Sequence, residues 1–138
     1  MALLAMQSGM APALWPGGVP QVKRSLCASL AYRLSLVAAG RVDGMVTLRD
    51  AWEWDIAAGV PIAARAGAVV TERMGAPIRF NAARPQAAGV VGAAPGLHGA
   101  LMGGLVPPVE QPASGGWFAS GGDPGNDPAI TPTELKRV

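Results

Sequence analysis

Residues 22–48, VKRSLCASLAYRLSLVAAGRVDGMVTL, predict a helix followed by a turn and a short strand. Apolar residues recur there at the spacing of one helical face: Leu26, Leu30, Leu34 and Val37. Three basic residues lie off that line: Lys23, Arg24 and Arg33. Ser25 or Ser29 can cap the helix, and Gly40 can end it. The chain then turns into a strand at 45–48.

The residues after this strand show further helical and strand patterns. A second helical run covers 54–66, where Pro61 removes one backbone donor and predicts a kink or an early end. Gly67 closes the run. The later elements that we expect are a strand at 68–71, a hairpin strand at 78–80, a buried strand at 89–93 and a helix opened by Pro95. This order predicts an α/β fold with a layered mixed β-sheet flanked by helices.

Shifts in composition divide the chain into three segments. Residues 1–21 are uncharged up to Gln21 and rich in Gly and Pro, which predicts an irregular N-terminal segment. Residues 22–105 form the expected α/β domain. Residues 106–138 are rich in Pro, Gly, Ser and Asp, so we expect a disordered Gly/Pro-rich tail in which only Trp117-Phe118 could dock.

The charge and apolar content exclude several classes of protein. Eleven basic and nine acidic residues give a net charge of +2, and no basic cluster is interleaved with aromatics, so no nucleic-acid partner is expected. No apolar run approaches the roughly 18 residues of a membrane span. The apolar N-terminus is a poor signal peptide, so we expect a cytoplasmic protein. The single Cys27 predicts neither an internal disulfide nor a zinc site.

Few side chains could carry chemistry. His98 is the only histidine, and its place at the start of a helix favours a surface residue over a catalytic one. Asp55 follows two tryptophans and precedes the small residues 57–59, a setting that suits a hard divalent cation with oxygen ligands. The alternative for Asp55 is a carboxylate that only stabilises a helix N-terminus. No glycine-rich nucleotide-binding loop follows a strand.

Several motifs occur in the order and spacing of a known family. They are SLAYRL at 29–34, VAAGRVDG at 37–44, WDIAAG at 54–59, AGAVVT at 66–71 and VVGAAPGLH at 90–98. Over about residues 22–104 the chain resembles the C-terminal half of the inositol monophosphatase superfamily. The SLAYRL and WEWD motifs look closest to those of its bacterial 3'(2'),5'-bisphosphate nucleotidases. The resemblance implies the C-terminal α/β domain of an inositol-monophosphatase-like fold.

The same resemblance implies a magnesium-dependent, lithium-sensitive phosphomonoesterase that removes the 3'-phosphate of adenosine 3',5'-bisphosphate. Asp55 takes the place of the family's aspartate that binds Mg²⁺, an ion that activates water for attack on the phosphate. Ala28 and Ser29 take the place of a Gly-Ser/Thr pair that contacts substrate. Ser29 as a helix cap without a ligand is the alternative. Thr47 falls near an acidic residue that grips the inositol ring, and its neutral side chain weakens the inositol interpretation.

Two departures from the family pattern stand out. A Glu-Ala-Gly-Gly motif is replaced by Arg65-Ala66-Gly67-Ala68, with an expected effect on packing and turn geometry. The Gly-Glu-Glu and Asp-Pro-Leu-Asp-Gly-Thr motifs, which hold most metal ligands, do not occur in these 138 residues. The segment DPGNDP at 123–128 has the wrong order and place to substitute for them.

These departures predict a truncated C-terminal portion that is inactive alone, because one carboxylate cannot hold a Mg²⁺ site. A missing N-terminal half or a homo-oligomer would then complete it. One alternative is an inositol-1-phosphate or sugar-phosphate phosphatase. The other is a non-catalytic remnant or binding module, whose uncovered face would favour oligomerisation.

Overall fold

A five-stranded mixed sheet in the order β2-β1-β3-β7-β5 forms the centre of the fold. The computed structural model describes residues 2–6 and 10–105. The strands are β1 (Leu3–Met6), β2 (Lys23–Leu26), β3 (Gly44–Thr47), β5 (Val69–Thr71) and β7 (Val90–Ala93). β1 runs parallel to β2 and β3, whereas β7 runs antiparallel to β3 and β5. The expected fold class, a mixed sheet flanked by helices, is confirmed.

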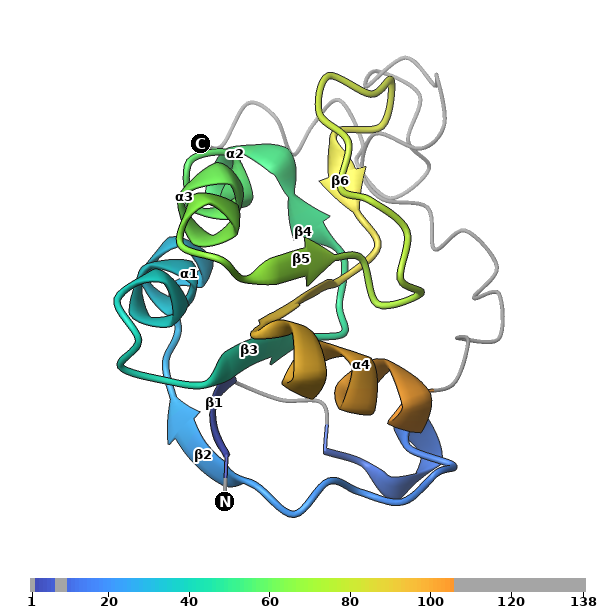
Figure 1. Cartoon of the computed structure of the whole chain (residues 1–138). Coiled ribbons are helices and arrows are strands. Elements are labelled where there is room, and N and C mark those ends of the chain that lie inside the picture. Colours follow the sequence, from blue (N-terminus) through green and yellow to red (C-terminus); the bar gives the residue numbers. More distant parts are fainter. Residues whose placement is uncertain (1, 7–9, 106–138) are drawn as a thin grey trace, which may run out of the picture. The chain divides into compact units, whose positions relative to one another are not determined.

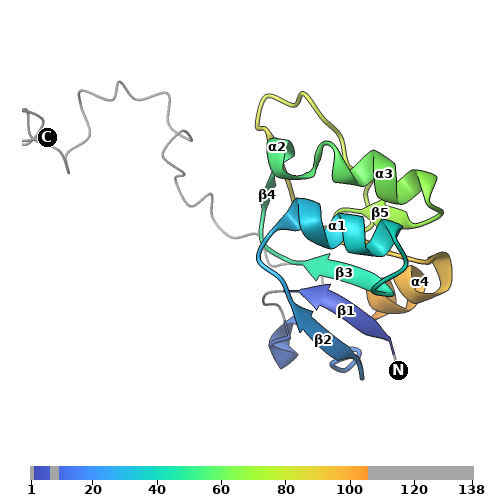
Figure 2. The same ribbon diagram turned by 90° about the vertical axis from the view of Figure 1, so that its left-hand side faces the viewer.

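Side chains of the inner strands alternate between the two faces of the sheet, and each face carries its own core. One core contains Ala5, Met45 and Val90 and packs against α1 (Leu30–Ala38) and α3 (Gly59–Arg65). The other contains Leu4, Met6, Val46 and Val91 and packs against α4 (Pro95–Gly104) and Trp15. Figures 1 and 2 show α1 and α3 together on one side of the sheet and α4 on the other.

A smaller unit stands beyond the carboxyl end of β3. It consists of β4 (Ala51–Trp52), which pairs antiparallel with β6 (Gln86–Ala87), and of the four-residue helix α2 (Glu53–Ile56). Figure 1 shows β4 and β6 apart from the main sheet, with α2 directly after β4. Neither of these two-residue strands is visible as a sequence pattern, because their pairing comes from residues more than 30 positions apart.

The N-terminal segment, expected to be irregular, contains an inner strand of the sheet. β1 lies between β2 and β3, and a short 3-10 helix, η1 (Pro12–Leu14), leads to Trp15, which is only 2% exposed. Of the two expected helix starts, the one at Ser25 is wrong, because Lys23–Leu26 forms β2 and leaves Leu26 73% exposed. A spacing of four apolar residues fits a helix, but pairing with β1 decides the conformation here.

The expected helix at 54–66 is divided into α2 and α3. The break falls at residues 57–58, so Pro61 becomes the third residue of α3. The first amides of a helix have no intrahelical acceptor, and a proline at this position therefore loses no hydrogen bond. The hairpin strand expected at 78–80 is absent as well. β5 pairs with β7, and one isolated bridge joins Thr71 to Pro77.

Several local predictions are confirmed. Ser29 is the N-cap of α1, Gly40 and Gly67 take the positive φ angles of 67° and 96° that end α1 and α3, and Pro95 is the first residue of α4. Arg65 lies in the last turn of α3, where a cation is favourable. Within the described residues no helix is long and apolar enough to cross a membrane. The tail predicted at 106–138 lies outside the described residues.

Candidate functional site

A cleft of about 700 Å³ lies at the carboxyl ends of β2 and β3. Its lining residues are Ala28, Ser29, Leu30, Ala31, Arg33, Thr47, Arg49, Asp50, Ala51, Trp52, Trp54 and Asp55. It therefore brings together all four residues singled out from the sequence: Ala28, Ser29, Thr47 and Asp55. Parallel strands have their carboxyl ends at one edge, which is where α/β folds commonly bind ligands.

Ser29 enters the cleft from the loop between β2 and α1. Its hydroxyl oxygen accepts a hydrogen bond from the amide of Tyr32 at 3.2 Å, so Ser29 does act as a helix cap. A hydroxyl that accepts one bond can still donate its proton, and no acceptor for that proton is found among the described residues. Capping and a ligand contact are therefore compatible at this position.

Arg33 is a buried cation in the lining of this cleft that sequence reasoning did not identify. The side chain is 2% exposed, and its guanidinium donates to the carbonyl oxygens of Ala28 at 3.2 Å and Ser29 at 3.4 Å. Its Nη1 is buried without a hydrogen-bond partner in the described part of the chain. Burial lowers the pKa of Arg33; Cys27 opposes this shift and Arg49 adds to it.

The signal for Arg33 was present in the sequence. Positions 30, 33, 34 and 37 form the i, i+3, i+4, i+7 set of one helical face, and Arg33 occupies the second of them. Its two backbone contacts hold Ala28 and Ser29 in place at the start of α1. Arg33 therefore shapes this wall of the cleft and adds positive charge to it.

Two carboxylates line the cleft, and they differ in their surroundings. Asp50 forms ion pairs with Arg73 at 3.2 Å and Arg84 at 3.0 Å. Asp55 is exposed in α2, and neither a hydrogen bond nor an ion pair to its side chain is found within residues 2–6 and 10–105. Of the two, Asp55 is the carboxylate available to a cation.

The described residues do not by themselves fit a magnesium ion. No group of three or more His, Cys, Asp or Glu side chains in the described ranges is arranged to hold a metal. Mg²⁺ requires near-octahedral oxygen ligation, so Asp55 could supply one ligand of a shared site but could not form that site alone.

Two tryptophans form a wall of the cleft beside Asp55. The rings of Trp52 and Trp54 are stacked, with centroids 4.5 Å apart and planes 11° from parallel. Trp52 is half-buried at the end of β4, whereas Trp54 in α2 is 66% exposed. The sequence showed the two tryptophans as neighbours but not that their rings stack in the lining of a cleft.

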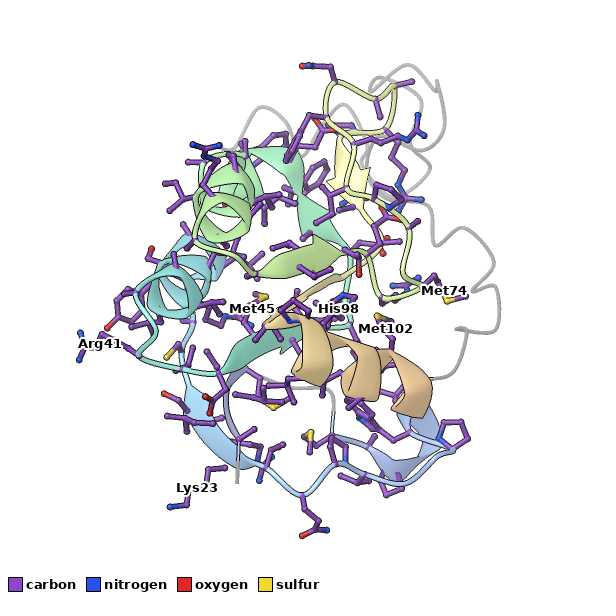
Figure 3. The ribbon with its side chains drawn as sticks, in the orientation of Figure 1. Lys23, Arg41, Met45, Met74, His98 and Met102 are labelled. Atoms are coloured by element: carbon purple, nitrogen blue, oxygen red, sulfur yellow. The ribbon has the colours of Figure 1, made fainter. Side chains whose placement is uncertain are left out.

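His98, expected on the surface, is buried and lies outside the cleft. It is 8% exposed, and its Nε2 is 2.8 Å from Oγ1 of Thr71 in β5. Figure 3 shows His98 and Met102 on α4, and the Thr71 hydroxyl also lies 3.7 Å from the sulfur of Met102. Burial lowers the pKa of His98. Its position joins α4 to the sheet and gives it no part in the cleft.

Comparison with known proteins shows one matching family and several solved structures with a similar fold. Residues 7–111 match the family model described as "Inositol monophosphatase family". Inositol monophosphatase from Anabaena is 29% identical, with a TM-score of 0.54 and coverage of 78% of this chain and 45% of that chain. The extragenic suppressor protein SuhB from Bartonella henselae is 25% identical, with a TM-score of 0.54 and coverage of 74% and 41%.

Inositol monophosphatase II from Staphylococcus aureus is 17% identical with a TM-score of 0.58, and the match covers 78% of this chain and 42% of that chain. No curated protein matches. The chain spans about two fifths of the length of these solved structures. Since the family model covers most of its residues, the chain belongs to the inositol monophosphatase family.

Proposed function

We propose that this chain is the C-terminal part of a Mg²⁺-dependent phosphomonoesterase of the 3'(2'),5'-bisphosphate nucleotidase type. The observation that carries the proposal is the convergence of Ala28, Ser29, Thr47 and an unpaired Asp55 on one cleft. Asp55 is one ligand of a metal ion, and the Ser29 hydroxyl donates a hydrogen bond to a substrate oxygen. The remaining metal ligands come from polypeptide outside the described residues, either an N-terminal half or a partner, in a cytoplasmic enzyme.

Thr47 favours a nucleotide over an inositol phosphate. Its side chain lines the cleft near the place where inositol phosphatases carry an acidic residue, and the threonine hydroxyl has neither the negative charge nor the second oxygen with which a carboxylate can hold two ring hydroxyls. An inositol or sugar phosphate is the second candidate. Structures of the Staphylococcus aureus protein are described as bound to inositol monophosphate and to 2'AMP, so one fold accommodates both classes there.

The first test is the activity of the chain alone. We expect no Mg²⁺-dependent release of phosphate from adenosine 3',5'-bisphosphate, because the described residues contain no group of three or more His, Cys, Asp or Glu side chains that could hold the ion. Phosphate release by the purified chain, with loss of activity on chelation of Mg²⁺, would contradict the division of the metal site between this chain and another polypeptide.

The second test restores the missing ligands. The chain is combined with a polypeptide that carries the Gly-Glu-Glu and Asp-Pro-Leu-Asp-Gly-Thr motifs, and phosphate release from adenosine 3',5'-bisphosphate and inositol 1-phosphate is compared. Asp55→Asn should abolish activity. Asp43→Asn is the matched control, because Asp43 lies at the opposite end of β3 and its amide oxygen could still accept the hydrogen bond from Leu3 N. Equal activity of the parent and Asp55→Asn complexes would refute the role of Asp55, and absence of activity would favour a non-catalytic binding module.

A further inference from the structure

We propose that Trp54, supported by Trp52, is a stacking platform for the base of a nucleotide whose phosphate lies beside Asp55. This inference rests on the proposed phosphatase function and names the part of the substrate that the cleft recognises. It makes Trp54 a specificity-determining residue, because an inositol or sugar ring has no aromatic face to stack.

The platform has one covered face and one open face. The two indoles are nearly parallel at 4.5 Å, so Trp52 covers one side of the Trp54 ring. Trp54 is nevertheless 66% exposed, and therefore most of its other side faces solvent. An aromatic ligand on that side would extend the stack, replacing an exposed apolar surface with a ring contact.

Hydrogen bonds of Trp52 and Glu53 fix the segment of backbone that carries the two rings. Trp52 pairs with Gln86 in the β4–β6 ladder, and the amide of the intervening Glu53 donates to the carbonyl of Pro85 at 3.0 Å. The Glu53 carboxylate accepts hydrogen bonds from the amides of Asn81 at 2.9 Å and Ala82 at 3.3 Å. A rigid aromatic surface loses little conformational entropy on binding, which favours a ligand contact.

The charges around the platform favour an anionic aromatic ligand. Arg33 and Arg49 line the same cleft as the two tryptophans. Of the two carboxylates there, Asp50 is already paired with Arg73 and Arg84, so Asp55 is the one lining carboxylate left to oppose the two cations. Trp54 and Asp55 both line the same cleft, so a nucleotide with its base on the indole would have its phosphate groups in the same cleft as the carboxylate. A nucleotide combines both of these features.

The test follows the indole N–H resonances of the ¹⁵N-labelled chain during titration with adenosine 3',5'-bisphosphate, adenosine and inositol 1-phosphate. We expect the Trp54 resonance to shift with both adenosine compounds and to remain unchanged with inositol 1-phosphate. Base stacking on an aromatic side chain is lost with the ring, so Trp54→Leu should weaken binding of adenosine 3',5'-bisphosphate by about 5- to 150-fold. Trp54→Phe keeps a ring and should retain most of the affinity.

Tyr32→Leu is the matched control, because Tyr32 is another exposed aromatic residue, on α1, that does not line the cleft. Equal binding by the parent and Trp54→Leu, no Trp54 shift with adenosine, or the same shift with inositol 1-phosphate would each overturn the platform. Failure of the phosphatase proposal gives a different result. In the chain combined with the polypeptide that carries the other metal ligands, adenosine and its bisphosphate would then bind equally well, without any effect of Mg²⁺ or of Asp55→Asn.

Discussion

Gly59 allows α3 to approach α1 closely, and a methyl group at this position should destabilise the domain. A Cβ built on Gly59 would lie 2.7 Å from both Cβ and Cδ1 of Leu34, a side chain that is fully buried. Ordinary carbon contacts are about 3.5–4.0 Å. Leu34 Cβ is attached directly to the backbone of α1, so rotation of the side chain cannot relieve the overlap and the two helices must separate.

The expected magnitude follows from two opposing effects. Overpacking of a core typically costs about 1–3 kcal/mol, whereas alanine gains up to about 1 kcal/mol over glycine in helix propensity. Because rotation of Leu34 cannot relieve the overlap, the cost should fall in the upper part of that range, about 2–3 kcal/mol. After the gain of about 1 kcal/mol in helix propensity, we expect Gly59→Ala to lower the free energy of unfolding by about 1–2 kcal/mol. For a domain of this size, that corresponds to a fall in Tm of roughly 4–16 °C.

Urea and thermal unfolding monitored by circular dichroism measure this change. Gly99→Ala is the matched control, because Gly99 is an exposed residue of α4 whose added Cβ would meet nothing within 4 Å. That variant should be stabilised by about 0.5–1 kcal/mol. If Gly59→Ala were as stable as the parent, the claim that close packing of α3 on α1 requires glycine at position 59 would be refuted.

Three further changes test other parts of the fold and the cleft. Ser29→Ala should lower the free energy of unfolding by about 1 kcal/mol through loss of the N-cap, while Ser29→Asp restores stability; urea unfolding that shows no difference would contradict the cap. Arg33→Met should leave the free energy of unfolding nearly unchanged, since the loss of two hydrogen bonds to Ala28 and Ser29 is offset by removal of an unpaired buried charge. The same variant should bind adenosine 3',5'-bisphosphate more weakly in titration calorimetry. Unchanged affinity would exclude an electrostatic role. Burial lowers the pKa of His98, so the unfolded chain takes up a proton first as pH falls below the ordinary value of 6.5. The contribution of neutral His98 to the free energy of unfolding is complete above pH 6.5 and is lost progressively as the pH falls toward the pKa of the folded state. Unfolding measured between pH 7.5 and 5 should show this pH dependence in the parent. His98→Gln, which can still contact Thr71, should lose it.

Several helix ends could be predicted from neighbouring residues in the sequence. The cap at Ser29 and the turn at Gly40 depend on neighbouring residues alone, as does the start of α4 at Pro95. The strands at 44–47 and 90–93 appear as short apolar runs because both faces of each are covered by helices.

Long-range pairing explains what sequence patterns missed. β1 and β2 are strands because they pair with each other and β1 also pairs with β3, about 40 residues away. A run such as Lys23–Leu26 carries no alternation strong enough to show this. His98 was expected on the surface, but packing of α4 against β5 buries its ring beside Thr71.

The sequence by itself determined the cap at Ser29, the glycine turns that end α1 and α3, the start of α4, the α/β class and the acidic residue at position 55, since each depends on residue types at short spacing. Only the tertiary structure decided that Asp55, Ser29 and Thr47 meet at one cleft, because the parallel course of β2 and β3 brings separate segments to the same edge of the sheet. It also decided that Arg33 is buried and that Trp52 and Trp54 stack, since burial and ring contact depend on neighbours that come from other elements.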